Sequence, residues 1–235
     1  MISVIIPTFN EAELLPKTLA HLRANPTLHE ILVVDAHSGD ATAQLAQAAG
    51  ARVILSVARQ RAVQTNLGAA QACGDLLVFV HADTWVPAGG LQAVEQVLRD
   101  PQVAGGAFAR RFQSPSLFLQ LSCWLAEGRS RLLGWHFGDQ ALFARKSVFH
   151  QLGGYRPWAL FEDLDFSRRL ASAGKVVTLR PAVRTSARRF TARGPMLTTL
   201  TDAWLTCRYL LGADPAILAA EMEEKQVRAP RTAHL

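Results

Sequence analysis

The sequence contains few cysteines and no long apolar run, and these two absences exclude several classes of protein. Its three cysteines, Cys73, Cys123 and Cys207, lie far apart and form no CxxC pair, so we expect buried, reduced thiols and no disulfide framework. No stretch approaches the roughly 20 apolar residues that cross a bilayer. The N-terminus also lacks the charged segment and long apolar run of a signal peptide. We therefore predict a soluble, cytoplasmic protein and leave peripheral membrane contact open.

Charged residues make up only 19% of the chain, and the net charge of +6 is carried mostly by arginine. The hydrophobic share of 49% over 235 residues is typical of a globular chain that buries one core. Arginine binds phosphate well, although arginine-rich codon usage would give the same excess. The sequence has no zinc-finger spacing, RNA-binding aromatic motif or basic low-complexity tail, so we expect no nucleic-acid partner.

Short apolar runs alternate with helical patterns through the first hundred residues. Four of these runs are typical of buried strands, at residues 2–6, 30–34, 51–55 and 76–80. With helices between them, the first capped by Asn10, this order predicts an α/β fold with a mostly parallel central sheet flanked by helices. In the less regular second half we expect strands at 103–109, 141–144 and 175–179, and helices at 114–126, 161–173 and from 194 onward.

The C-terminal part of the chain raises two separate questions. The absence of a repeat or linker favours a single domain over residues 1–213, followed by a charged tail over 214–235 that we expect to fray or dock loosely. The last predicted helix carries an apolar stripe made of Leu197, Leu200, Trp204, Cys207 and Leu211. The alternatives for what covers this stripe are, in order of preference, the sheet, another subunit and a membrane surface.

Polar residues follow three of the predicted strands, at the edge where open α/β sheets bind ligands. These residues are Thr8 to Glu11 after the first strand, Asp35 after the second, and His81 to Asp83 after the fourth. A carboxylate at Asp83, with a neighbour two positions earlier, suits a divalent cation that neutralises a diphosphate. The alternative is that Asp35 and Asp83 only cap the next helix or turn.

Three acidic residues, Glu162, Asp163 and Asp165, cluster at the start of a later predicted helix. A carboxylate here could accept the proton of an acceptor hydroxyl. The helix dipole by itself also favours acids in a first turn, so the pattern leaves both interpretations open.

Five motifs stand in order along the chain: VIIPTFNE at 4–11, VVDAHSGDAT at 33–42, QTNLG at 64–68, GDLLVFVHAD at 74–83 and FEDLDFSRRL at 161–170. Together, over residues 2–180, they resemble the family 2 glycosyltransferases of the GT-A fold. The segment from Arg59 to Asn66, followed by His81 to Thr84, further resembles a bacterial subgroup that is labelled as arsenosugar-biosynthesis glycosyltransferases.

The resemblance implies a role for each matching residue. Around the uracil, ribose and phosphates of the donor it places Pro7, Thr8, Asn10, Glu11, Asp35, Arg61, Gln64 and Asn66. The DXD motif corresponds to His81, Ala82 and Asp83, in which Asp83 binds the diphosphate and a metal, Mn²⁺ or Mg²⁺. The catalytic base corresponds to Asp163, with Glu162 beside it. His81 departs from the family's aspartate, and an imidazole there can ligate the metal or stay neutral beside the ribose.

Two further pairs are candidates for the acceptor side. Asp139 and Gln140 resemble a family segment that lines the acceptor site, so they touch the donor sugar or the acceptor unless they only form a turn. Arg188 and Arg189 would clamp the departing diphosphate from a mobile loop, unless they belong to a solvated basic face.

Together with the resemblance, these residues predict a metal-dependent glycosyltransferase that moves a sugar from a nucleotide-diphosphate sugar, first of all a UDP-sugar, to a hydroxyl of a small-molecule or lipid-linked acceptor. Inversion at the anomeric carbon is implied by the resemblance alone. A nucleotidyltransferase would need a glycine-rich loop after the first strand, and a dehydrogenase would need GxGxxG there; the loop has neither. A non-catalytic nucleotide-sugar-binding module is expected to lose Asp83 or Asp163, yet both are present.

Overall fold

The computed structural model describes residues 1–227, and all side chains among them except those of 191–193 and 223–227. The strands are β1 Ile2–Thr8, β2 Leu28–Asp35, β3 Arg52–Leu55, β4 Leu76–Phe79, β5 Thr84–Trp85, β6 Val103–Phe112, β7 Phe143–Arg145 and β8 Lys175–Thr185. The helices are α1 Leu15–Arg23, α2 Thr42–Ala48, α3 Arg61–Gln71, α4 Gly90–Val97, α5 Leu117–Leu133, the 3₁₀ helix η1 Gly138–Gln140, α6 Lys146–Gln151, α7 Glu162–Ala173, α8 Arg188–Arg193, α9 Pro195–Leu210 and α10 Pro215–Val227.

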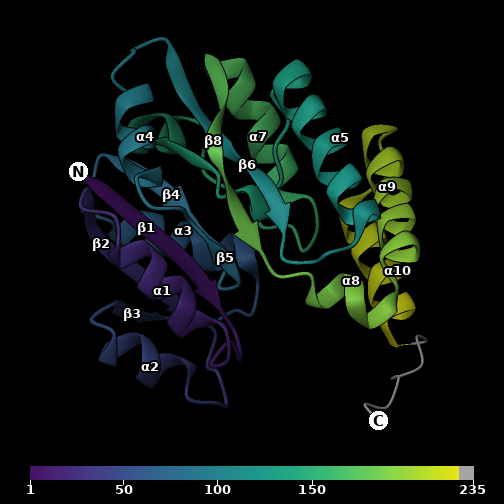
Figure 1. The fold of residues 1–235 in the computed structure, drawn as a ribbon, viewed down its shortest axis with the longest axis horizontal. Helices are drawn as coiled ribbons and strands as arrows, with labels where there is room; N and C mark the ends of the chain where they lie inside the picture. Colours follow the sequence, from purple (N-terminus) through teal and green to yellow (C-terminus); the bar gives the residue numbers. More distant parts are fainter. Residues whose placement is uncertain (228–235) are drawn as a thin grey trace.

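Within that part of the chain the eight strands form one sheet, in the order β3-β2-β1-β4-β7-β6-β8-β5 (Figure 1). Strands β3, β2, β1 and β4 are parallel, and so are β6 and β8, while β7 and β5 run antiparallel to their neighbours. The predicted α/β fold with a mostly parallel sheet flanked by helices is confirmed. The carboxyl ends of β1, β2 and β4 therefore meet at one edge, as the sequence predicts.

The alternation of side chains along β1 explains why helices cover both faces of the sheet. Ile2, Val4 and Ile6 join a buried cluster with Leu15 and other residues of α1. Ile5 points to the opposite face, into a second cluster with residues of α3 and α7. Both clusters are fully apolar, as strands buried on both faces require.

Two helix starts differ from the expectation: α1 has no side-chain cap, and α5 is capped by Ser116. Asn10 does not cap α1: its φ is +54°, its side chain accepts the N–H of Gly39, and α1 begins only at Leu15. Helix α5 begins after Ser116, whose hydroxyl accepts the N–H of Leu119, and it ends at Leu133, well beyond the predicted end.

The C-terminal expectations need the largest corrections. Residues 215–227 form α10, whose Leu218 is buried in one cluster with Leu205 of α9; residues 228–235 lie outside the described part, and the domain boundary at 213 stays a prediction. The stripe on α9 does not cover the sheet, since Leu197, Leu200 and Trp204 remain 59–64% exposed. Of the cysteines, Cys123 is buried, whereas Cys73 and Cys207 are exposed. Among the helices of residues 1–227, none is both long and apolar enough to cross a membrane.

Candidate active site

The ends of β1 and β2 are joined through the carboxylate of Asp35. This side chain is 1% exposed and accepts hydrogen bonds from the hydroxyl of Thr8 (3.0 Å) and from the N–H (2.8 Å) and hydroxyl (2.5 Å) of Ser38. The hydroxyl of Ser38 in turn accepts the N–H of Asn10 (2.8 Å). The two loops that follow β1 and β2 thus form one hydrogen-bonded rim at the crevice.

The side-chain amides of two residues of α3 form hydrogen bonds with the backbone of other segments. Gln64 is buried and donates to the carbonyls of Thr8 and Val34, both at 2.8 Å. Asn66 donates to the carbonyl of Tyr155 (2.7 Å) and accepts the N–H of the same residue (2.9 Å). Through these bonds Gln64 supports the rim and Asn66 supports the loop before α7, and the contact of either residue with a nucleotide stays a prediction.

A pocket lies between the two halves of the sheet, where β1 and β4 meet η1 and α7. Its walls bring together residues from distant parts of the sequence: Pro7, Arg61, Thr65, Phe79, Val80, His81, Gly138, Tyr155, Glu162 and Asp163. Two of the predicted functional groups, the strand-end histidine and the acidic pair, therefore share one cavity.

Asp163 is fixed by two backbone donors. Its Oδ2 atom accepts the N–H of Gly138 (2.6 Å), and its Oδ1 atom accepts the N–H of Leu164 (2.7 Å) in the first turn of α7. Gly138 has no room for a side chain, because a Cβ atom there would lie 2.6 Å from Nε2 of His81 and 3.1 Å from Oδ2 of Asp163. The imidazole and the carboxylate therefore approach one another across a glycine.

Burial sets the protonation of the acidic pair. Desolvation, followed by the neighbouring charge of Asp163, raises the pKa of Glu162 to about 7, against the opposing effect of Arg61 at 3.2 Å. Burial also raises the pKa of Asp163, against the N–H of Gly138. The phenol of Tyr155 stays protonated, because burial and then the charges of Asp163 and Glu162 raise its pKa.

The raised pKa of Glu162 predicts how stability depends on pH. Between the unfolded pKa of 4.5 and the folded value of about 7, the folded protein binds more protons at this residue, so the free energy of unfolding falls as pH rises. We expect Glu162→Gln to raise the melting temperature relative to the wild type more at pH 8 than at pH 5, in thermal scans at both values.

Glu30 provides a control of opposite sign for that experiment. Its burial is outweighed by donors at Ser3, Cys73 and Gly74, which lower its pKa. Glu30→Gln should therefore lower the melting temperature more at pH 8 than at pH 4. If Glu162→Gln changed the melting temperature equally at pH 8 and pH 5, the carboxylate of Glu162 would not be destabilised by burial.

Asp83 and His81 supply only part of a metal site. Within the described residues, no three histidine, cysteine or acidic side chains lie together as metal ligands. Burial, and then the charge of Arg61, lowers the pKa of His81 to about 3, which leaves a neutral imidazole with a lone pair for a metal. Burial, Glu11 and Asp139 raise the pKa of Asp83, against Arg188. One carboxylate and one imidazole fit a divalent cation if a diphosphate supplies further oxygens.

Arg188, which is far from the first strands in sequence, lies at the crevice beside Glu11 and Asp83. Its guanidinium lies 2.6 Å from Oε1 of Glu11 and 3.5 Å from Oδ2 of Asp83. The second carboxylate oxygen of Glu11 is buried without a hydrogen-bond partner in the part of the chain that the structure describes. The crevice thus holds an acceptor that a ligand hydroxyl would satisfy.

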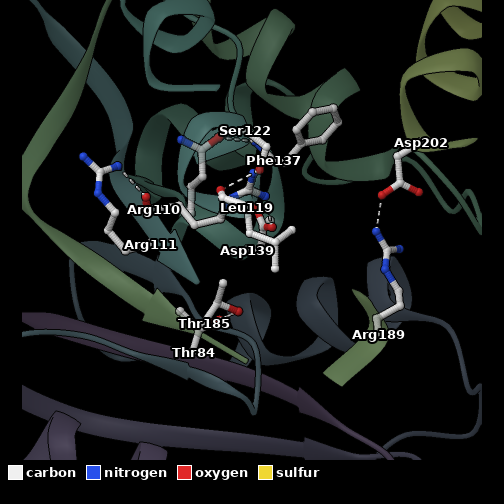
Figure 2. Close-up of polar contacts among 12 residues, drawn as sticks. Thr84, Arg110, Arg111, Leu119, Ser122, Phe137, Asp139, Thr185, Arg189 and Asp202 are labelled. Carbon is white, nitrogen blue, oxygen red and sulfur yellow. Dashed lines mark hydrogen bonds and ion pairs between the residues drawn. The ribbon is translucent and has the colours of Figure 1, made fainter. Parts of the chain in front are cut away.

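The remaining acceptor-side candidates divide into two groups. Asp139 pairs with Arg110 near His81, and its Oδ1 atom is another buried acceptor without a partner among the described residues. Gln140 is 1% exposed and its amide binds Phe137, Ser130 and Phe108, so its bonds are made within the chain, and a contact with sugar or acceptor stays a prediction. Figure 2 shows Arg189 directed to Asp202 of α9, away from Asp139, and its contact with a diphosphate stays a prediction.

Three contributors to the site were not predicted from the sequence. Gly138 and Tyr155 stood beside predicted motifs, yet their roles depend on the approach of η1 to α7, which no local pattern encodes. Arg110 belongs to a long strand whose burial pattern turns half-exposed near its end. The available signal for Arg110 was an arginine near the end of a predicted strand, and the structure pairs it with Asp139, a predicted acid.

Comparisons with known proteins identify the family and the fold. The sequence matches the family described as "Glycosyl transferase family 2" over residues 3–153. The 4,4'-diaponeurosporenoate glycosyltransferase of Staphylococcus haemolyticus is 38% identical over 90 residues, which are 35% of this chain and 24% of that relative. The chain therefore corresponds to a minor part of the relative's length.

Solved structures share the fold. S. aureus TarS 1-349, which has also been solved with UDP, superposes with a TM-score of 0.66 at 15% identity, covering 79% of this chain and 60% of TarS. The mannosyltransferase PcManGT from Pyrobaculum calidifontis, in complex with GDP-Man and Mn²⁺, gives a TM-score of 0.64 at 22% identity, covering 79% of this chain and 56% of its own. At these identities the likeness concerns the fold alone.

Proposed function

Because the chain belongs to glycosyl transferase family 2, we propose that it transfers a sugar from a nucleotide-diphosphate sugar to an acceptor hydroxyl, with inversion at the anomeric carbon. The observation that carries this proposal is the position of Asp163, held by Gly138 N–H beside His81, at the crevice where β1, β2 and β4 end. A carboxylate with a raised pKa in such a place is suited to take a proton near neutral pH.

The donor is expected to be a UDP-sugar, in a transferase domain over residues 1–213. The rim around Thr8, Asn10 and Asp35 offers a place for the nucleoside, and the unpartnered Oε2 atom of Glu11 offers an acceptor for a ribose hydroxyl. TarS has been solved with UDP and with UDP-GlcNAc, whereas PcManGT has been solved with GDP-Man. UDP and GDP sugars are thus the first two donor classes to compare.

The chemistry follows from the residues that line the pocket. Asp163 accepts the proton of the acceptor hydroxyl, and the Gly138 N–H keeps its carboxylate oriented for that step. Arg61 holds Glu162 beside it. A divalent cation bound by Asp83 and His81, with the diphosphate, would neutralise the charge of the leaving group. Arg188 already lies against Asp83 and Glu11, within reach of the same phosphates.

The acceptor and the narrower family assignment are also proposals. The relative from Staphylococcus haemolyticus is named for 4,4'-diaponeurosporenoate, which makes an amphiphilic or lipid-linked acceptor a first class to test beside small water-soluble ones. The likeness to arsenosugar-biosynthesis transferases stays a prediction from the segment Arg59 to Asn66. A nucleotidyltransferase is disfavoured because the loop after β1 has no glycine to wrap phosphates.

Donor binding tests the site before any acceptor is known. We expect UDP to bind well in calorimetry only when Mn²⁺ or Mg²⁺ is present, since Asp83 and the diphosphate repel one another. Asp83→Asn should lower the cation-dependent affinity by about tenfold or more. Asp75→Asn is the control, because its carboxylate is 82% exposed beside the N-terminus. Equal UDP affinity with Mn²⁺ and with EDTA would remove the metal from the proposal.

A further inference from the structure

Helices α5 and α9 expose apolar side chains along their outward faces. Residues on α5 that are 53–85% exposed are Leu117, Leu121, Trp124, Leu125 and Leu132. On α9, Met196, Leu197, Leu200 and Trp204 are 59–64% exposed. The two helices pack beside one another at the side of the molecule opposite β3 (Figure 1). We call these nine residues the apolar face.

The charged residues of both helices are bound by other charged or polar groups of the chain. Glu127 of α5 is 3% exposed, Arg129 donates to Trp135 and Gln140, and Arg131 pairs with Glu127. On α9, Asp202 pairs with Arg189 and Arg208 pairs with Glu221. A helix on the surface of a water-soluble domain has the reverse arrangement, with its apolar stripe inward.

Positive charge borders the apolar face along α5. Arg111, Arg131 and Arg180 converge on the single carboxylate of Glu127, at 2.7–3.4 Å, and their side chains are 39–56% exposed. Three positive charges around one negative charge leave this margin with two formal positive charges, on a chain whose net charge is already +6. A partner for the face must therefore tolerate or attract positive charge at its edge.

The positive charge of this margin helps to decide between two partners for the apolar face, a second copy of the chain and a lipid surface. A two-fold dimer brings the same patch of both copies together, so the basic margins of two apolar faces would approach one another. An anionic lipid surface instead attracts the positively charged margin, and its acyl-chain region can bury the leucine side chains. Trp124 and Trp204 suit the headgroup level of a bilayer, where amphipathic indole rings are favoured.

We propose that the apolar face of α5 and α9 lies on the surface of a bilayer that contains anionic lipids. The binding is peripheral, with the helices parallel to the surface. The proposal does not depend on sugar transfer, because it concerns side chains outside the pocket, and it is tested without a donor. Helix α8, which brings Arg188 to the crevice, packs against the N-terminal end of α5 through Phe190 and Leu119, so the face adjoins the open side of the crevice.

Flotation with lipid vesicles tests the proposal on the full chain. We expect the wild type to float with vesicles of phosphatidylcholine and phosphatidylglycerol, and less with phosphatidylcholine alone. Replacing both Trp124→Ser and Trp204→Ser should lower the vesicle-bound fraction, expressed as a partition coefficient, by at least about tenfold. Both side chains are mostly exposed, so the melting temperature should stay close to the wild-type value.

A matched control comes from the side of the molecule opposite the apolar face, at strand β3. Leu55 and Val57 are 59% and 98% exposed near β3, and replacing both by serine should leave flotation unchanged. The proposal is overturned if the wild type does not float with anionic vesicles, or if both double variants lose flotation equally. It is also overturned if sedimentation shows a dimer that only the tryptophan double variant dissociates, while flotation is unaffected.

Discussion

Asp163→Asn is expected to reduce the rate of sugar transfer by about 10² to 10⁴, the usual cost of removing a general base. Asparagine keeps the size of the side chain, and its single oxygen can still accept the N–H of Gly138, although the bond from the N–H of Leu164 is then lost; we expect the pocket to keep its shape. The proposed donor site lies toward Asp83, and UDP affinity should therefore change little. Turnover, UDP binding and melting temperature measured on the same variant separate a lost base from a lost fold.

Asp165→Asn is the matched control for this experiment. Asp165 lies in the same first turn of α7, but its carboxylate pairs with Arg169 and Arg156 outside the pocket. We expect this variant to lower the melting temperature and to keep the rate of the folded enzyme. If Asp163→Asn binds UDP, melts normally and transfers sugar at the wild-type rate, the base must be assigned elsewhere, first to Glu162.

Gly138→Ala has the second largest expected effect. The added Cβ would lie 2.6 Å from Nε2 of His81, so the imidazole or η1 must move, and with it the N–H that orients Asp163. A displacement of about 1 Å in a catalytic arrangement costs about 10²-fold in rate. We expect a loss of this size in steady-state transfer, with UDP binding weakened if His81 helps to hold the metal.

Gly128→Ala gives the comparison for a harmless glycine. A Cβ at Gly128 meets nothing within 4 Å among the described residues, and the position is helical, so alanine should stabilise α5 slightly. The rate of this variant should equal that of the wild type. A Gly138→Ala enzyme with the same rate as Gly128→Ala would show that the close approach of His81 and Asp163 is not needed for transfer.

The sequence was sufficient for the parts of the fold that depend on local pattern. Each polar residue follows a buried strand in the sequence. Because the strands were predicted to be parallel, Thr8, Asp35 and Asp83 were expected at the same edge of the sheet, and the observed strand arrangement places them there. The apolar stripe on α9 was recognised too. Periodicity could not say what covers the stripe, because the same pattern serves a helix on a sheet and a helix with an exposed apolar face.

The sequence could not predict which partners the polar side chains of the site have within the chain. Gln64, Asn66 and Gln140 are amides in the expected places, but an amide binds backbone as readily as phosphate or sugar. The partner in each case comes from a distant part of the sequence: the carbonyls of Thr8 and Val34 for Gln64, that of Tyr155 for Asn66, and that of Phe108 for Gln140. The two neighbouring arginines divide for the same reason: Arg188 meets Glu11 and Asp83, and Arg189 meets Asp202.

The central claim is that Asp163 acts on an acceptor while a nucleotide-diphosphate sugar occupies the crevice. It is tested most directly by the release of nucleoside diphosphate from UDP-, GDP- and TDP-sugars, with Mn²⁺ or Mg²⁺, in a cell extract that supplies acceptors. We predict release from at least one donor, UDP-sugars first, that depends on the extract, stops with EDTA and is lost in Asp163→Asn. Release that is equal in the wild type and in Asp163→Asn, or absent with every donor, would contradict the claim.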